Sequence, residues 1–267
     1  FLLARNHALP LDQQRTATTL VILIDSLCVL AILAMPLTWR RTLLVGVMIV
    51  AFVALFPVEA VRDFYALALP RGYRRAGGHI YRPACPRCRA CTPSRIPVAS
   101  FAPDRSQRRC LARNDDLEVS LEPASASDEA YALYQRYLQQ RHPGGGMDDA
   151  DPEDFSRFLV CPWSPTRFLC FRAGGRLVAV AVTDVMREGL SSVYTFYEPG
   201  EAARGLGTYA ILSQVALARR EGLAHVYLGY WIDGHPKMGY KSRFHPLEVL
   251  RGQRWERVDG SMPVRGA

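Results

Sequence analysis

The sequence predicts an α+β protein in which helices flank a mixed β-sheet. A valine-rich apolar run at 177–185, preceded by the turn pair Gly174-Gly175, indicates a buried strand that belongs to a hairpin. Apolar residues also recur at helical spacing over 130–138, directly after Ser127, whose hydroxyl suits a helix N-cap. Strand and helix signals of this strength in one stretch of chain argue against an all-helical or an all-strand protein.

The elements after residue 165 follow a defined order. We expect three strands at 168–171, 177–185 and 191–197. A helix at 205–221, ended by Gly222, and a fourth strand at 224–232 follow them. This β-β-β-α-β succession, with glycines opening the helix, is the order of the acyl-CoA N-acetyltransferase (GNAT) core. The predicted organisation starts with an atypical apolar segment (1–60) and a small Cys/Arg-rich domain (61–122). A GNAT-like domain (123–258) and a tail (259–267) follow.

The glycine loop Arg204-Gly205-Leu206-Gly207-Thr208 opens the predicted helix. Glycines before a helix N-terminus let backbone N–H groups approach an anion, and the helix dipole favours negative charge there. The candidate binding residues of this loop are Arg204, Gly205, Gly207 and Thr208. The anion bound by these residues would be a CoA pyrophosphate or the terminal phosphates of an RNA. The alternative is that the glycines form a strand–helix turn that binds nothing.

The stretch 227–244 holds both lysines of the chain, Lys237 and Lys241, whereas the other basic side chains apart from histidine are arginines. An ammonium is a mobile point charge and a guanidinium a planar fork, so the pair indicates a contact of the lysine type. Aromatic side chains around the lysines offer stacking surfaces for a base or a ribose: Tyr230, Trp231, Tyr240 and Phe244. The alternative is an amphipathic strand that runs into a basic surface loop.

The formal net charge of +8 is concentrated between Arg71 and Arg113, where eleven arginines accompany a single acid, Asp104. An arginine-biased proteome would explain the arginines but not the missing acids. The block therefore indicates a polyanionic partner.

Seven cysteines include the cluster Cys85-x-x-Cys88-x-x-Cys91. An odd number in this arrangement does not match a secreted disulfide framework and indicates a reducing compartment. Three thiolates could hold zinc or an iron–sulfur cluster with a fourth ligand such as His79. Reduced thiols in a tight turn are the equal alternative.

Residues 1–60 differ from the rest of the chain in being largely apolar. Thr42–Val58 carries no charge over 17 residues, and Trp39-Arg40-Arg41 separates it from an apolar run at 18–38 that contains Asp25. A membrane hairpin with a basic turn, a buried helical pair, and a truncated, fused or mis-read start all explain this pattern. The arginine-poor start without a small-residue cleavage site argues against a signal peptide.

Several motifs in a fixed order resemble the arginyl-tRNA–protein transferase family. The N-terminal ones are Gly72-Tyr73-Arg74-Arg75-Ala76-Gly77, Ile80-Tyr81-Arg82-Pro83 and the Cys cluster followed by Arg95-Ile96-Pro97-Val98. Those typical of the bacterial branch are Ser106-Gln107-Arg108-Arg109, Arg113-Asn114, 141–147, Tyr194-Thr195-Phe196-Tyr197 and the stretch with both lysines. The resemblance spans residues 71 to 257 and departs at the front, where no cysteine stands before Cys28 to supply the family's Cys-x-Tyr element.

The resemblance implies a cytoplasmic aminoacyltransferase that moves leucine from leucyl-tRNA to the N-terminal amine of proteins beginning with Asp or Glu. Such transfer marks them for N-end rule (N-degron) degradation. The implied partners are leucyl-tRNA and these proteins, with no required cofactor and no obligatory membrane partner. Arginyl transfer by the same chemistry, a CoA-dependent N-acyltransferase, and an inactive tRNA- or degron-binding protein are the alternatives.

The chemistry needs little beyond orientation, because an aminoacyl ester is activated and an α-amine has a pKa of about 7.7–8.0. Asp233 is expected to orient or deprotonate the amine, unless it only forms an Asp-Gly turn, and Tyr230 and Tyr240 are expected to donate to the carbonyl or ribose. Cations are needed for the acceptor carboxylate; the candidates are Arg75, Arg82 and Lys241. The arginine block including Arg95, the glycine loop, Trp231 and Lys237 are expected to hold the tRNA.

Overall fold

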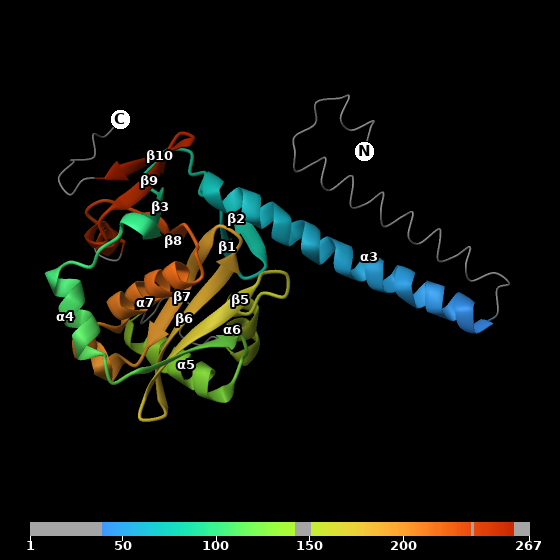
Figure 1. Ribbon diagram of the computed structural model, residues 1–267, viewed down its shortest axis with the longest axis horizontal. Coiled ribbons are helices and arrows are strands. Elements are labelled where there is room, and N and C mark those ends of the chain that lie inside the picture. Colours follow the sequence, from blue (N-terminus) through green and yellow to red (C-terminus); the bar gives the residue numbers. More distant parts are fainter. Residues whose placement is uncertain (1–38, 142–150, 236–237, 259–267) are drawn as a thin grey trace. The chain divides into compact units, whose positions relative to one another are not determined.

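The computed structural model describes residues 39–141, 151–235 and 238–258 (Figure 1). By its internal contacts the chain forms two compact units, 1–60 and 61–267. The second unit carries the sheet and the candidate site, and the rest of this section concerns that unit. The first expected apolar run, 18–38, lies outside the described residues. Among the helices that are described, none has both the length and the apolarity to cross a membrane.

Helices and short 3₁₀ turns alternate with strands along the chain. The helices are α3 (Trp39–Ala68), α4 (Arg105–Arg113), α5 (Asp128–Arg141), α6 (Pro152–Leu159) and α7 (Leu206–Arg220). The 3₁₀ turns are η1 (Leu69–Arg71), η2 (Val98–Ser100), η3 (Pro199–Arg204) and η4 (Gly239–Arg243). The strands are β1 (Arg74–Ala76), β2 (His79–Tyr81), β3 (Thr92–Pro97), β4 (Glu118–Pro123), β5 (Thr166–Ala173), β6 (Arg176–Met186), β7 (Gly189–Tyr197), β8 (His225–Trp231), β9 (Leu247–Arg251) and β10 (Arg254–Val258).

Eight of the strands form one mixed sheet in the order β10-β9-β3-β8-β7-β6-β5-β4. Its pairs are antiparallel except for β7 and β8, which run parallel. The strands β1 and β2 form a separate antiparallel hairpin. A large mixed sheet with flanking helices confirms the predicted α+β class.

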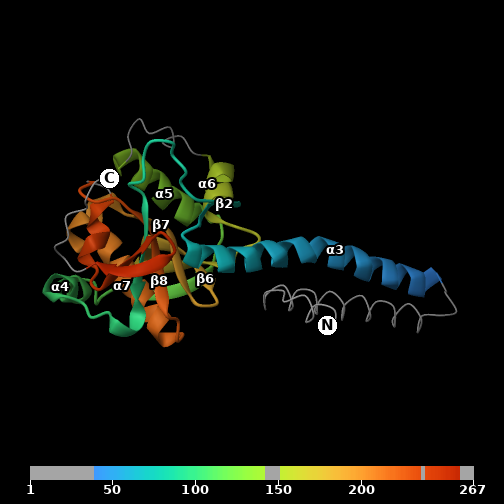
Figure 2. The same ribbon diagram turned by 90° about the horizontal axis from the view of Figure 1, so that it is seen from above.

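Helices cover both faces of this sheet, and each face has its own core. On one face, α7 and α4 pack on alternate residues of β5 such as Leu169 and Phe171. On the other face, α5 and α6 pack on the intervening residues Phe168 and Cys170. Figure 2 shows the two helix pairs on opposite sides of the strands. The central strands are therefore buried on both faces, which explains why β5 and β6 are apolar without a polar alternation.

The parallel pair β7–β8 is short, and the two strands separate beyond it. Their paired residues are only Gly189 with His225, Leu190 with Val226 and Ser191 with Tyr227. A side chain at Gly189 would place its Cβ 2.5 Å from the carbonyl oxygen of His225, so the start of the pair needs glycine. Past Ser191 and Tyr227 no ladder joins the strands, and their backbone groups need other partners.

The helix and hairpin predictions were accurate in this unit. The turn between β5 and β6 uses Gly174 and Gly175 at positive φ, and α5 begins where Ser127 accepts a hydrogen bond from the backbone of Ala130. The helices α4 and α6 and the strands β4, β9 and β10 were not predicted. The predicted domain boundary at residue 122 remains a prediction. In space β3, from the Cys/Arg-rich stretch, pairs with both β8 and β9 inside the main sheet.

Candidate functional site

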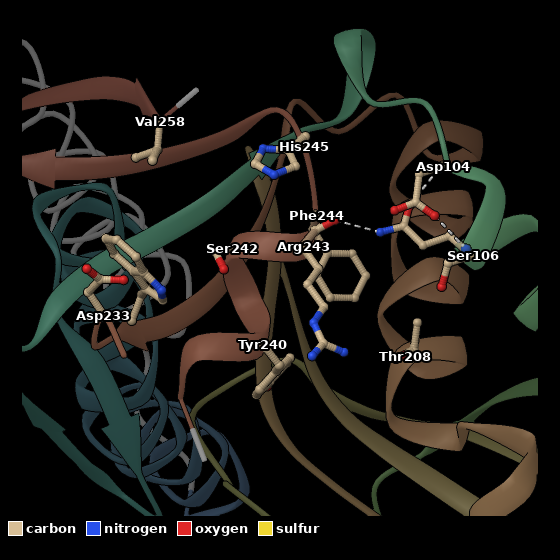
Figure 3. Close-up of a pocket in the computed structure, with 12 residues that line it drawn as sticks. Asp104, Ser106, Thr208, Asp233, Tyr240, Ser242, Arg243, Phe244, His245 and Val258 are labelled. Carbon is tan, nitrogen blue, oxygen red and sulfur yellow. Dashed lines mark hydrogen bonds between the residues drawn. The ribbon is translucent and has the colours of Figure 1, made fainter. Parts of the chain in front are cut away.

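A pocket of about 620 Å³ lies where α4, α7, η4 and the end of β8 meet (Figure 3). Its lining comprises Asp104, Ser106, Gln107, Thr208, Trp231, Asp233, Tyr240, Ser242, Arg243, Phe244, His245 and Val258. Five of these residues were singled out from sequence: Thr208, Trp231, Asp233, Tyr240 and Phe244. Residues that are far apart in the chain thus converge on one cavity of a size suited to a small organic group.

The first turn of α4 fixes one wall of the pocket. Asp104 caps this helix, since its carboxylate accepts from the N–H of Gln107 at 2.7 Å while the Gln107 side chain accepts from the N–H of Asp104 at 3.0 Å. The same Gln107 side chain donates to the carbonyl oxygen of Arg243 at 2.9 Å. A reciprocal capping box therefore also holds η4 in place across the pocket.

The glycine loop leads to Thr208, which lies on the same side of the pocket as Asp104 and Ser106 (Figure 3). Gly205 adopts a φ of 68° and precedes α7, whose third residue, Thr208, lines the pocket. A side chain at this φ would be strained, which gives Gly205 a conformational role. The expected phosphate contact of Arg204 is less well supported, because its guanidinium already binds Asp116 at 2.7 Å and Glu201 at 3.0 Å. In this structure Arg204 positions the loop rather than facing the pocket as a free cation.

At the end of β8, Trp231 and Asp233 lie on the pocket side. The indole nitrogen of Trp231 is buried and has no hydrogen-bond partner among the described residues. A buried donor without an acceptor is costly, so the pocket has capacity for an acceptor at this wall. Asp233 is exposed, which leaves its carboxylate accessible to an incoming group.

Tyr240 and Tyr230 have different environments. Tyr240 lines the pocket with 43% of its surface exposed, while desolvation of its hydroxyl and the nearby Tyr137 raise its pKa to about 12, so the hydroxyl stays protonated and able to donate. The Tyr230 hydroxyl is buried and donates to the carbonyl oxygen of Gly72 at 2.9 Å. The hydroxyl proton of Tyr230 is therefore already used in an internal hydrogen bond. In this structure it is not free for the expected donation to a carbonyl or ribose.

Lys241 is buried, with only 5% of its surface exposed. Its ammonium donates to the carbonyl oxygen of Tyr230 and lies 3.8 Å from the sulfur of Met238. Burial, together with the positive charge of Arg74, lowers its pKa to about 7. A lysine in this environment is charged or neutral depending on modest changes of pH.

This lysine is expected to make stability depend on pH. Its pKa is lower in the folded protein than in the unfolded chain, so the unfolded chain binds more protons above pH 7 and the free energy of unfolding should rise with pH. Between pH 7 and 8.5 the rise attributable to Lys241 should be roughly 1–2 kcal/mol. Urea titrations of the wild type and Lys241→Met at several pH values check this, because the difference between the two curves removes the contribution of the cysteines. A pH-independent difference would contradict it.

Arg75 does not face a substrate. Its guanidinium binds Asp184 at 2.7 and 2.8 Å and Thr166 at 3.0 Å, and neither side chain of the ion pair is exposed. The prediction that Arg75 binds the acceptor carboxylate conflicts with this geometry, because an internal carboxylate already occupies the fork.

The other predicted cations are also placed differently. Arg95 binds Glu248 at 2.7 Å and stacks over the ring of Trp255 at 4.2 Å, so it ties β3 to β9 and β10 rather than standing free for tRNA. Arg82 is exposed and lies near the hydroxyl of Tyr230. Lys237 lies outside the described residues. The arginine block is therefore partly internal structure and only partly a surface for a polyanion.

The three clustered cysteines do not form a metal centre in the described part of the chain. Cys85 and Cys88 are exposed and Cys91 is partly buried, and burial and the two neighbouring thiols raise the pKa of Cys91. No three His, Cys, Asp or Glu side chains within residues 39–141, 151–235 and 238–258 gather as ligands. His79 lies exposed on β2. The described residues as placed do not fit a metal site.

Arg74 was missed by the sequence analysis. It is 7% exposed, donates to the carbonyl oxygen of Tyr227 at 3.2 Å and also donates to that of Ser192. Neighbouring residues of a strand point to opposite faces, so Arg74 and Arg75 diverge to different partners. The one usable signal was Gly229 inside an apolar strand, which suggests close approach of another group, and the Arg74 guanidinium does pack against it.

The chain matches two family models, described as the N terminus and the C terminus of arginine-tRNA-protein transferase, over residues 51–109 and 129–251. A protein of Stenotrophomonas maltophilia (strain K279a) named aspartate/glutamate leucyltransferase is 58% identical over 207 residues, which are 75% of this chain and 82% of that protein. One of the same name from Xylella fastidiosa (strain 9a5c) is 51% identical over 206 residues, 75% and 81% of the two chains.

Among solved structures, L-PGS from Bacillus licheniformis superposes with a TM-score of 0.43 and 15% identity over 66% of this chain and 54% of that one. At that distance the likeness carries no argument about the site. The family matches and the close relatives place the chain among the aminoacyltransferases. It belongs to the arginine-tRNA–protein transferase family.

Proposed function

We propose that the chain transfers leucine from leucyl-tRNA to the N-terminal amine of proteins that begin with Asp or Glu, and so marks them for degradation by the N-end rule. The observation that carries this is the 58% identity over 207 residues to a relative named for that activity. The pocket supports it, because all of its lining residues except Val258 lie within the residues matched by the two family models. A cytoplasmic location is part of the proposal, since its partners are aminoacyl-tRNA and newly exposed protein N-termini.

The reaction is an acyl transfer from an ester to an amine. The amine nitrogen forms a bond to the leucyl carbonyl carbon, the bond from that carbon to the ribose oxygen breaks, and the proton lost by nitrogen ends on the ribose hydroxyl. Asp233 orients the amine and accepts its proton, while the protonated Tyr240 hydroxyl donates to the carbonyl or to the leaving ribose oxygen. The pocket holds the aminoacylated end of the tRNA, with Trp231 beside the terminal base.

The sheet supports a core of the N-acetyltransferase type. Strands β5, β6 and β7 are antiparallel, α7 follows with a glycine at its start, and β8 pairs in parallel with β7 before the two separate. In such a core the separated strands leave space for an acyl donor. Here the donor is an aminoacyl ester rather than a thioester, and the family membership favours that choice over a CoA-dependent enzyme.

The test is transfer of radiolabelled leucine from leucyl-tRNA to peptides that begin with Asp, Glu or Ala. We expect label in the Asp and Glu peptides and little in the Ala peptide. Parallel reactions with arginyl-tRNA and with acetyl-CoA separate the two alternatives, since arginyl transfer is the activity named in the family description. Two results would contradict the proposal: a peptide labelled from acetyl-CoA without tRNA, or no peptide labelled with any of the donors.

A further inference from the structure

We propose that Arg74 and Lys241 together form the binding site for the carboxylate side chain of the acceptor's first residue, an inference that rests on the proposed function. Both lie at the region where β7 and β8 separate. Neither lines the pocket assigned to the aminoacyl end. The two cations would therefore select Asp or Glu from a second site beside that pocket.

Both cations donate to backbone carbonyl oxygens of one strand, β8. Arg74 donates to the carbonyl oxygens of Tyr227, the last paired residue of β8, and of Ser192, which follows the last paired residue of β7. Lys241 donates to the carbonyl oxygen of Tyr230, three residues further along β8. Gly229 lies between them at a φ of 80°, and a Cβ there would lie 3.5 Å from the Arg74 guanidinium. Both cations thus bond to β8 at and beyond the point where its pairing with β7 ends.

The charge of this pair is not compensated within the described part of the protein. Arg74 and Lys241 are 7% and 5% exposed, and neither forms an ion pair with a carboxylate of the described residues. Their hydrogen-bond partners are carbonyl oxygens and a thioether, which accept protons but carry no negative charge. Two buried cations near each other are costly, and an arriving carboxylate would remove that cost.

The position of Lys241 in η4 separates this site from the pocket. Its neighbours Tyr240 and Ser242 line the pocket, whereas Lys241 turns to the backbone of β8. The α-amine and the side chain of an acceptor's first residue are joined through one carbon, so they need adjacent but distinct sites. The arrangement of η4 supplies them: Tyr240 on the side of the reacting carbonyl and Lys241 on the side of the carboxylate.

The charged and titratable groups around Lys241 determine its response to pH. They are Arg74 on β1, Cys91 before β3, Tyr230 on β8 and the adjacent Tyr240, whose ring centroid is 5.8 Å from the ammonium. Of these, Arg74 favours the neutral lysine and Cys91 the charged one. The neutral lysine cannot compensate a carboxylate, so preference for an acidic acceptor should weaken as pH rises above about 7.

The test is the ratio of kcat/KM for a peptide beginning with Asp to that for the same peptide beginning with Asn, at saturating leucyl-tRNA. Asn has nearly the same shape, and the α-amine ionises in both peptides, so the ratio isolates the carboxylate. Lys241→Met should lower the ratio on the order of 30-fold or more, through the KM of the Asp peptide. Lys241→Arg should keep the preference for Asp over Asn. That preference should no longer weaken above pH 7, because a guanidinium stays charged. Arg187→Gln, at an exposed arginine on the turn between β6 and β7, is the matched control and should leave the ratio unchanged.

Distinct outcomes separate the two proposals. Wild-type protein that transfers leucine to no peptide would refute the proposed function. Active wild type with an unchanged ratio in Lys241→Met would refute the carboxylate site alone, as would equal loss with both peptides. A raised KM for leucyl-tRNA in Lys241→Met would assign the lysine to an RNA phosphate instead. Because Lys241→Met removes a buried charge, it should fold, and its urea midpoint verifies this.

Discussion

Replacing Arg75 with methionine is expected to lower the free energy of unfolding by about 3–5 kcal/mol, because it leaves the Asp184 carboxylate buried without its partner. Asp184 would retain only the hydroxyl of Thr166, which donates to it at 2.7 Å. The carboxylate would then have to take up a proton on folding. The measurement is the midpoint and slope of urea unfolding, with the slope showing that the transition itself is unchanged.

A matched double variant distinguishes the ion pair from general damage. Asp184→Leu combined with Arg75→Met removes both charges and should recover much of the lost stability, as replacement of buried ion pairs by apolar groups often does. If Arg75→Met were as stable as the wild type but had lost preference for acidic acceptors, Arg75 would belong to the acceptor site and the buried pair would be a minor contribution.

Asp233→Asn is expected to lower kcat by about 100-fold, the lower range for loss of a positioned general base, with a small effect on either KM. Asparagine keeps the size and one acceptor oxygen, so the loss would report the charge rather than the shape. Single-turnover transfer from leucyl-tRNA to an Asp peptide measures the chemical step directly. Asp115→Asn, an exposed acid on the turn after α4, is the control and should be fully active. A kcat within twofold of the wild type would leave Asp233 as part of a turn.

Local signals in the sequence predicted the sheet's centre well. Glycine pairs, caps and apolar runs act over a few residues, and they located the β5–β6 hairpin, the start of α5 and the ends of α7. The strand β4 escaped because its residues are mostly exposed at a sheet edge and alternate weakly. The helix α4 escaped because its arginines suggested a charged surface, whereas its capping box was the stronger signal.

The candidate site was predictable in part. Aromatic and acidic residues near the lysines did converge on the pocket, since they follow one strand and one turn. The roles of the arginines were not predictable from composition. A cation free for a ligand and one paired internally look alike in a sequence, and only the long-range partners Asp184, Glu248 and Asp116 separate them. Arg74 and Arg75 illustrate this limit. They are adjacent and identical in type, yet Arg75 pairs with the carboxylate of Asp184 whereas Arg74 donates to backbone carbonyl oxygens.

The position of β3 has a consequence for how the chain folds. This strand begins at Thr92, yet its neighbours β8 and β9 start at His225 and Leu247, so its hydrogen bonds join residues more than a hundred positions apart. Such pairing is slow, because a long loop must close before any contact forms. On the ribosome, β3 must wait with its edges unpaired until β8 and β9 have been synthesised. Nascent chains that end before residue 225 should therefore be the most aggregation-prone form of this protein.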